Sequence, residues 1–337
     1  MRESVRAAVV GAGGWGTALA ALMARRGHQV VLWSFEEHVA ASIERTLVNP
    51  YLDGVTLPES LAVTTDLATA VGGAELVLSV SPSQFVARVM GAAAPHIRPD
   101  AIVVSASKGI ELDTLRSMDQ VMGSFLPAGL MERFCVLSGP SFAAEVARET
   151  ATAVVVASRN AQAARRVQAL LQTDCFRVYT NPDVVGVELA GALKNVIAVG
   201  AGMAAGLGAG HNTLAALITR GLAEITRLGV ALGAERATFS GLAGMGDLVL
   251  TCTGSLSRNR TVGYRLGRGE KLTEILADMT AVAEGVKTAE AVHALAARHG
   301  VEMPISEQVY AIVHEGRSPV EAMRALMLRD PKPEEWS

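Results

Sequence analysis

The chain has 337 residues, of which 50% are hydrophobic and 19% are charged, and its formal net charge is −3. This balance argues against an intrinsically disordered chain, and it excludes the concentrated basic surface that binds nucleic acid or an anionic membrane. The three cysteines are widely spaced and the histidines lack metal-binding spacing, so we expect a reducing compartment, the cytoplasm, and no metal site. The 30 basic residues are 25 Arg and only five Lys, which are Lys108, Lys194, Lys271, Lys287 and Lys332.

A basic start followed by the uncharged stretch 7–24 has the composition of a signal sequence or a membrane span. Four glycines interrupt that stretch, and Arg25 and Arg26 end it. Such a sequence favours a strand, a glycine-rich turn and a helix over a membrane span. We therefore expect neither a targeting segment nor a membrane-spanning helix.

Short β-branched runs alternate with helical stretches through the first half of the chain. The expected strands are Val5–Val10, Val30–Trp33, Leu76–Val80, Ile102–Ser105, Cys135–Ser138, Ala153–Ala157 and Arg177–Tyr179. Helices are expected at Trp15–Arg26 and Val39–Arg45. Strands that are apolar throughout and alternate with helices indicate a parallel sheet that is covered on both faces.

After about residue 181, long Ala- and Leu-rich helical stretches replace the strand-like runs. The expected helices are Val184–Ala205, Thr213–Leu232, Leu272–Ala277, Val286–His299, Ile305–His314 and Pro319–Met327. The sequence therefore predicts an α/β fold, with a Rossmann-like, doubly wound and mostly parallel sheet in residues 1–181 and an all-α substrate domain in residues 182–328. Residues 329–337 contain two prolines and no periodicity, and we expect them to be a mobile tail.

A GxGxxG sequence runs from Gly11 to Gly16, directly after the first strand and at the start of the first helix. In this context it predicts a dinucleotide-binding turn. Gly11 permits the tight turn, Gly13 lets the backbone approach a pyrophosphate, and Gly16 lets the helix pack on the strand. The helix N-terminus then offers N–H groups to the phosphates. The alternative is a glycine-rich turn that binds no ligand.

The residue that selects between NAD and NADP is expected near the end of the second strand. An acidic residue there binds the ribose hydroxyl of NAD, whereas an Arg accommodates the extra phosphate of NADP. Glu36 lies twenty residues after Gly16, slightly beyond the expected strand end, and no Arg follows closely. This pattern favours NAD weakly and leaves NADP open.

Two of the five lysines occupy chemically suggestive positions. Lys108 lies just past the strand Ile102–Ser105, at the edge where open α/β sheets bind ligands, although it could also be a solvated loop residue. Lys194 lies in a helix that is apolar or small on most faces, so it either extends to solvent or is held in a cleft. Burial lowers the pKa of a lysine toward neutrality, which suits proton transfer with an alcohol, and Asn195 beside it could fix a substrate oxygen.

Two further segments carry polar groups in a pattern that suggests chemistry. A turn with hydroxyl groups follows the strand Cys135–Ser138, and a Gly- and Ser-rich segment contains Asp247, Thr251, Arg258 and Asn259. Arg258 and Asn259 could hold a phosphate together. The alternative for Arg258 is a surface arginine.

Five sequence blocks occur in order, at Gly11–Ala18, Ser107–Glu111, Ser138–Ala143, Gly191–Asn195 and Gly246–Arg260. In combination they resemble the bacterial type of NAD(P)-dependent glycerol-3-phosphate dehydrogenase, over about residues 5–315. The resemblance implies reversible hydride transfer between NAD(P)H and dihydroxyacetone phosphate, which gives sn-glycerol 3-phosphate for glycerophospholipid synthesis. A homodimer is the expected assembly, although the sequence does not determine the oligomeric state.

The resemblance and the residue patterns together give the expected site. Lys194 matches the family's proton donor and acceptor. The expected substrate residues are Lys108, Gly139, Ser141, Lys194, Asn195, Asp247, Thr251, Ser257, Arg258 and Asn259. The expected cofactor residues are Gly11, Gly13, Gly14, Trp15, Gly16, Ser34, Lys108, Ala143, Arg258, Val282 and Glu284.

The sequence departs from the family at Ser34 and Phe35, which stand where family members often carry a basic residue. This departure leaves a preference for NADP open. Two other readings compete with the resemblance. One is a dehydrogenase of similar build that acts on a β-hydroxy acid, which the Ser257–Arg260 block disfavours. The other is a non-catalytic dinucleotide sensor, which has no need of Lys108, Lys194 and Asp247 together.

Overall fold

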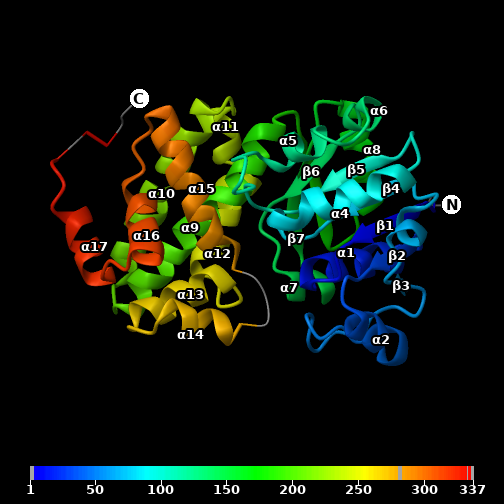
Figure 1. The fold of residues 1–337 in the computed structure, drawn as a ribbon, viewed down its shortest axis with the longest axis horizontal. Helices are drawn as coiled ribbons and strands as arrows, with labels where there is room; N and C mark the ends of the chain where they lie inside the picture. Colours follow the sequence, from blue (N-terminus) through cyan, green and yellow to red (C-terminus); the bar gives the residue numbers. More distant parts are fainter. Residues whose placement is uncertain (1–3, 280–282, 332, 335–337) are drawn as a thin grey trace. The chain divides into compact units, whose positions relative to one another are not determined.

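The structure, a computed structural model, describes residues 4–279, 283–331 and 333–334. The chain forms two compact units (Figure 1). The N-terminal unit consists of Met1–Lys108 and Arg116–Val187, and the C-terminal unit consists of Gly109–Leu115 and Glu188–Ser337. A short segment from the first half of the sequence thus belongs to the second unit.

Within the described residues, the N-terminal unit is built on one eight-stranded sheet. Its strands are β1 Arg6–Val10, β2 Gln29–Trp33, β3 Ala62–Thr64, β4 Leu76–Ser79, β5 Ile102–Ser105, β6 Cys135–Ser138, β7 Thr152–Ala157 and β8 Phe176–Asn181. Their order is β3-β2-β1-β4-β5-β6-β7-β8, and each neighbouring pair is parallel except β6 with β7, which is antiparallel. The predicted Rossmann-like, mostly parallel sheet is confirmed.

Helices bury both faces of this sheet, as its continuous apolar strands require. They are α1 Gly14–Arg25, α2 Glu37–Thr46, α3 Leu67–Val71, η1 Ser83–Phe85, α4 Val86–Ala93, η2 Ala94–His96, α5 Met118–Gly123, α6 Ala128–Met131, α7 Ala143–Ala147 and α8 Ala161–Leu171. Residues of α1, α7 and α8 share one apolar core with the strands, and α3 packs on β1 and β2. The carboxyl ends of β1, β2, β5 and β6 are followed by the turns and loops that carry the expected site residues of this unit.

The C-terminal unit is helical in the part of the chain that the structure describes. Its elements are α9 Val184–Gly206, which begins at the end of the first unit, α10 His211–Ala231, α11 Arg236–Phe239, the π-helical turn η3 Leu242–Gly246, α12 Asp247–Thr253, α13 Arg258–Gly267, α14 Leu272–Ala277, α15 Glu284–His299, α16 Pro304–Glu315 and α17 Pro319–Met327. The predicted helical character of the C-terminal region is confirmed.

Helix α9 is long and apolar enough to cross a membrane, and among the described residues it is the one helix that passes that test. Inside the protein, however, 94% of its most apolar window is buried. The same apolar composition is expected of a central core helix, because such a helix has no face toward water.

Glycines bring the backbones of α9 and α13 into direct contact. A Cβ atom on Gly202 of α9 would lie 2.1 Å from the carbonyl oxygen of Arg260, and a Cβ on Gly263 of α13 would lie 1.9 Å from that of Val199. Any side chain at either position would therefore force the helices apart. This close packing joins the helix that carries Lys194 to the helix that begins at Arg258.

The sequence patterns located most strands and the long helices but did not name every element. The unnamed elements include β3, η3 and the helices α3, α4, α5, α6, α7, α8, α11, α12 and α13. Many of these are short or glycine-rich and show little apolar periodicity. Of the expected mobile tail, residues 332 and 335–337 lie outside the described residues. In the described part, Arg329 pairs with Glu302, and Arg220 donates to the backbone carbonyl of Glu334 at 3.2 Å.

Candidate active site

The glycine-rich turn has the backbone geometry that its sequence predicts. Gly11 has a φ of +126°, and a Cβ there would lie 2.9 Å from the carbonyl group of Val80. A Cβ on Gly16 would lie 1.9 Å from the carbonyl oxygen of Gly11, so only glycine lets α1 start this close to the turn. Gly13, in contrast, has open space around its Cβ position. The fold itself requires glycine at Gly11 and Gly16, whereas the open space beside Gly13 is available to a ligand.

The start of α1 fits a dinucleotide in two further respects. Gly13, the N-cap residue, provides no side-chain hydrogen bond to the helix, so the first N–H groups of α1 have no side-chain cap. The indole Nε1 of Trp15 is buried and has no hydrogen-bond partner among the described residues. Ala143, the first residue of α7, would lie 3.7 Å from a Cβ on Gly14. Four of the expected cofactor residues, Gly13, Gly14, Trp15 and Ala143, are therefore grouped around one helix start.

The residues after β2, where a carboxylate is expected to bind the ribose, contact one another. Ser34 is fully buried, and its hydroxyl donates to the backbone carbonyl of Glu36 at 2.9 Å. Glu36 is the N-cap residue of α2, and its carboxylate accepts a long hydrogen bond, 3.5 Å, from the hydroxyl of Tyr51. Burial and this carboxylate raise the pKa of Tyr51. The Ser34 side chain thus shapes the turn, while Glu36 carries the negative charge.

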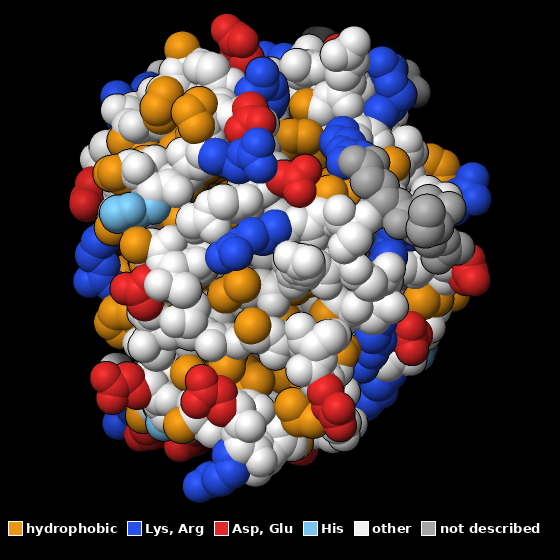
Figure 2. Space-filling model, turned by 90° about the vertical axis from the view of Figure 1, so that its right-hand side faces the viewer, with side chains coloured by type: hydrophobic (Ala, Val, Ile, Leu, Met, Phe, Trp, Pro, Cys, Tyr) orange, Lys and Arg blue, Asp and Glu red, His pale blue; other side chains and the backbone are white. Residues whose placement is uncertain are grey.

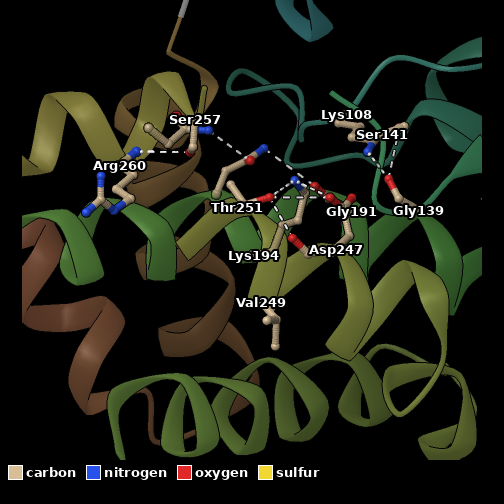
Figure 3. A network of polar contacts seen from close by, with 12 residues as sticks. Lys108, Gly139, Ser141, Gly191, Lys194, Asp247, Val249, Thr251, Ser257 and Arg260 are labelled. Atoms are coloured by element: carbon tan, nitrogen blue, oxygen red, sulfur yellow. Dashed lines mark hydrogen bonds and ion pairs between the residues drawn. The ribbon is translucent and has the colours of Figure 1, made fainter. Parts of the chain in front are cut away.

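Lys108, Gly139 and Ser141 come together at the carboxyl ends of β5 and β6 (Figure 3). The Lys108 ammonium donates to the carbonyl oxygen of Gly139 at 3.2 Å, and the Ser141 hydroxyl donates to the same oxygen at 3.0 Å. Gly139 has a φ of +131°, and a Cβ there would lie 3.0 Å from Val154, so the turn after β6 depends on glycine. The structure thus gathers three expected substrate residues within the N-terminal unit.

Lys194, Asp247 and Thr251 form a buried polar cluster in the C-terminal unit (Figure 3). The Lys194 ammonium lies 2.8 Å from a carboxylate oxygen of Asp247, and it donates to the hydroxyl of Thr251 at 2.6 Å. That hydroxyl in turn lies 2.6 Å from the carbonyl oxygen of Asp247, to which it donates. Asp247 and Thr251 face the same lysine because they are four residues apart on α12.

Lys194 is only 5% exposed, so it does not extend to solvent. A buried ammonium requires a counter-charge, and Asp247 at 2% exposure provides it. The neighbouring Cys252 thiol plays a different part. Burial raises its pKa to about 12, and the charge of Lys194 opposes that shift only partly. The cluster therefore contains a charged lysine next to a neutral thiol that is a poor nucleophile.

Asn195 and Asn259 form a chain of hydrogen bonds, and a main-chain N–H determines which amide atom donates and which accepts. The N–H of Gly285 in α15 donates to Oδ1 of Asn259 at 2.9 Å, which leaves Nδ2 of Asn259 to donate to Oδ1 of Asn195, also at 2.9 Å. The Nδ2 of Asn195 then faces the carbonyl of Gly191 at 3.5 Å. Because the first donor is a main-chain N–H, the amide orientations follow from the hydrogen bonds themselves. One N–H of the Asn195 amide donates to Gly191, and the other N–H is therefore the group of Asn195 that is left for a further contact.

The remaining expected residues lie at the starts of α13 and α15. Ser257 is the N-cap residue of α13, and its hydroxyl accepts a hydrogen bond from the N–H of Arg260 at 3.2 Å. Desolvation lowers the pKa of the Arg258 guanidinium, and the nearby carboxylate of Glu284, the first residue of α15, opposes that shift. Val282, an expected cofactor residue, lies outside the described residues. Within the described residues, no group of three His, Cys, Asp or Glu side chains is placed to hold a metal ion.

Comparison with known proteins identifies the family. Residues 6–164 match the model of the N-terminal part of NAD-dependent glycerol-3-phosphate dehydrogenase, and residues 183–324 match the model of its C-terminal part. The chain belongs to the NAD-dependent glycerol-3-phosphate dehydrogenase family. The resemblance read from the sequence is therefore confirmed, and the chain is a member of a family of oxidoreductases.

Individual relatives of this dehydrogenase family match almost the whole chain. Glycerol-3-phosphate dehydrogenase [NAD(P)+] of Geobacter metallireducens is 58% identical over 97% of this chain and 98% of its own length. The enzyme of the same name from Geobacter sulfurreducens is 56% identical over 99% of this chain and 100% of its own length. The crystal structure of glycerol-3-phosphate dehydrogenase from Coxiella burnetii superposes with a TM-score of 0.92, at 40% identity, over 97% of this chain and 99% of that one.

One group near the dehydrogenase's expected cofactor residues escaped sequence analysis. Arg88 of α4 lies against Phe35, the residue that stands where the family often has a basic side chain. The two are more than fifty residues apart in the sequence, and no local pattern links them. On the face shown in Figure 2, acidic and basic side chains are intermixed, as the small net charge of −3 suggests.

Proposed function

We propose that this chain reduces dihydroxyacetone phosphate reversibly to sn-glycerol 3-phosphate with NAD(P)H, and so supplies the glycerophospholipid backbone. The observation that carries the proposal is the buried Lys194–Asp247 ion pair, 2.8 Å long, within a chain of this dehydrogenase family. A carbonyl that accepts a hydride also needs a proton, and Lys194 is the group positioned to give it.

In the direction of reduction, the Lys194 ammonium donates a proton to the oxygen on C2 of the substrate as negative charge develops there. In oxidation, the lysine accepts the hydroxyl proton from the same oxygen. Asp247 and Thr251 hold the ammonium in place, at 2.8 and 2.6 Å, and Asp247 balances its charge in the buried cluster. Asn195 offers its amide N–H to a substrate oxygen, because its own acceptor is already bound by Asn259.

The N-terminal unit provides the dinucleotide site. The turn Gly11–Gly16, the start of α1 and the partnerless Nε1 of Trp15 hold the pyrophosphate side of the cofactor. When bound, the reduced nicotinamide supplies the hydride. Ala143, Glu284 and Val282 complete the expected cofactor contacts, and Lys108 adds positive charge to both substrate and cofactor sites.

The substrate phosphate does not react, but the protein can bind it and so position the reacting carbon. Arg258 and Asn259, with Ser257 at the same helix start, are the proposed phosphate residues, assisted by Lys108, Gly139 and Ser141. Binding energy from the phosphate then positions the carbonyl, which lowers the entropic part of the barrier. We assign cofactor binding to residues 1–181 and proton transfer to residues 182–328, and we expect a cytoplasmic homodimer that acts on a small-molecule substrate.

The proposal is tested by following NADH and NADPH oxidation side by side, with dihydroxyacetone phosphate and with β-keto acids as substrates. Oxidation that depends on dihydroxyacetone phosphate is the expected result. Turnover of a β-keto acid instead would favour the β-hydroxy acid dehydrogenase, and tight NADH binding without turnover would favour a dinucleotide sensor. Size-exclusion chromatography with light scattering tests the homodimer separately.

A further inference from the structure

Two exposed aromatic rings and an arginine form a cluster at the carboxyl end of the sheet. Phe35 follows β2 and is 67% exposed, and Phe85 ends η1, after β4, and is 40% exposed. Arg88 projects from the first turn of α4, with its guanidinium carbon 5.7 Å from the ring centre of Phe35 and 5.2 Å from that of Phe85. We call these three residues the Arg88 cluster.

Trp33 of β2 holds the Phe35 ring of the Arg88 cluster in place. Trp33, the last residue of β2, packs edge-on against Phe35 with ring centres 6.2 Å apart, and its indole N–H donates to the carbonyl of Thr65 at 2.9 Å. A guanidinium within about 6 Å of two ring faces is attracted by both, which restricts its long side chain. The structure records no hydrogen bond or ion pair between Arg88 and another described residue. The Arg88 guanidinium is thus held in position by the two rings, and its five N–H donors are not paired with a carboxylate of the described residues.

The position of the cluster relates it to the cofactor rather than to the reacting carbon. In the sheet, β1 lies between β2 and β4, so the loops that carry Phe35 and Phe85 flank the glycine-rich turn after β1. In folds of this type the adenosine ribose lies at the end of the second strand, where an arginine accommodates the 2′-phosphate of NADP. The sequence has no basic residue at Ser34 or Phe35, the expected places for it.

We propose that Arg88 is the group that lets this dehydrogenase accept NADP(H), by binding the 2′-phosphate from α4 instead of from the β2 turn. A guanidinium binds a phosphate through two parallel N–H···O bonds, which a distant point charge does not reproduce. Glu36, at the same strand end, is the counterpart that binds the ribose hydroxyls of NAD(H). This inference rests on the proposed function only in taking a dinucleotide as the ligand.

The test uses a cofactor fragment that cannot react. Binding of 2′,5′-ADP and of 5′-ADP is measured by calorimetry on the full-length protein and on Arg88→Ala, with circular dichroism to check the fold of the variant. We expect Arg88→Ala to weaken 2′,5′-ADP about 10- to 100-fold, the range for losing hydrogen bonds to a charged group, and to change 5′-ADP less than about twofold. Arg98→Ala is the matched control, because Arg98 is another exposed arginine of this unit that pairs with Asp100 at 2.6 Å.

Three outcomes would overturn the proposal. Equal loss for both fragments would mean that Arg88 stacks on adenine and does not read the phosphate. No preference of the unmodified protein for 2′,5′-ADP, or an equal effect of Arg98→Ala, would mean that no 2′-phosphate site exists at α4. Since fragment binding needs no turnover, absence of dihydroxyacetone phosphate reduction would contradict the proposed function without affecting this test.

Discussion

The two units of this dehydrogenase place their functional groups by different means. In the N-terminal unit the glycine-rich turn offers main-chain N–H groups, and glycine is required at Gly11, Gly16 and Gly139 because a Cβ would meet other backbone atoms within 1.9 to 3.0 Å. In the C-terminal unit the key groups are side chains on packed helices, with Lys194, Asp247 and Thr251 all at most 5% exposed. A strand-end site thus depends on backbone shape, whereas a helical site depends on charge pairing in the core.

The largest effect should follow from removing the buried ammonium. We expect Lys194→Ala to lower kcat about 100- to 10,000-fold, the usual contribution of a positioned proton donor, with a smaller change in KM. Lys271, an exposed lysine at the N-cap of α14, provides the control Lys271→Ala, for which we expect unchanged kcat. Steady-state kinetics in both directions measures the difference, and equal kcat values for the two variants would remove Lys194 from the mechanism.

Loss of the counter-charge should test whether the helical site depends on charge pairing. Asp247→Ala leaves a buried lysine without its carboxylate, which we expect to lower the free energy of unfolding by about 3–5 kcal/mol. Asp100→Ala removes a carboxylate from the Arg98 pair at the surface, where the expected loss is about 0–1 kcal/mol. Urea denaturation of both variants gives the comparison. Similar losses in the two variants would show that the burial of the Lys194 pair has little energetic consequence.

A single methyl group should test whether the strand-end site depends on backbone shape. Gly13→Ala places a Cβ in open space, so the fold should be retained, but the methyl group would occupy the approach of the pyrophosphate. We expect the Kd for NADH to rise about tenfold, through the displaced phosphate contacts. Gly91→Ala in α4, which also has open space at its Cβ, is the control. Unchanged NADH binding in Gly13→Ala would place the pyrophosphate elsewhere.

The smallest effect concerns a buried carboxylate far along α10. Glu224 accepts hydrogen bonds from the N–H groups of Ile305 and Ser306, yet burial raises its pKa to about 7. The folded protein therefore binds a proton that the unfolded chain releases at about pH 4.3, so this group lowers the stability as pH rises from there to about 7. Between pH 5 and pH 8 the unfolding free energy of Glu224→Gln should fall less than that of the unmodified protein. A parallel decrease in urea denaturation would contradict this.

The sequence was a good guide where one feature dominates locally. The apolar runs that predicted β5, β6 and the core of β1 coincide with the strands, because parallel strands buried on both faces leave an unbroken apolar signal. Lys194 stood out because an apolar helix contained one ammonium, and the structure pairs it with Asp247, the residue expected to orient it.

Features that depend on tertiary contacts were not predictable in this way. Helices α12 and α13 escaped the patterns, although they carry Asp247, Thr251 and Asn259, since α12 is only seven residues long and the glycines of α13 serve packing against α9 and weaken its apolar periodicity. Arg88 was missed for a related reason. Its contact with Phe35 joins helix α4 to the residue that follows shortly after β2, and no spacing in the sequence indicates that the two are neighbours.

The central claim is that the Lys194 ammonium gives the substrate its proton. Its most direct test is chemical rescue of Lys194→Ala with a series of small primary amines, measured as dihydroxyacetone phosphate reduction at fixed NADH. The account predicts that activity returns in proportion to amine concentration, with rates that depend on the pKa of the amine as expected for proton transfer. Turnover of Lys194→Ala that equals that of the unmodified enzyme without any amine would contradict it.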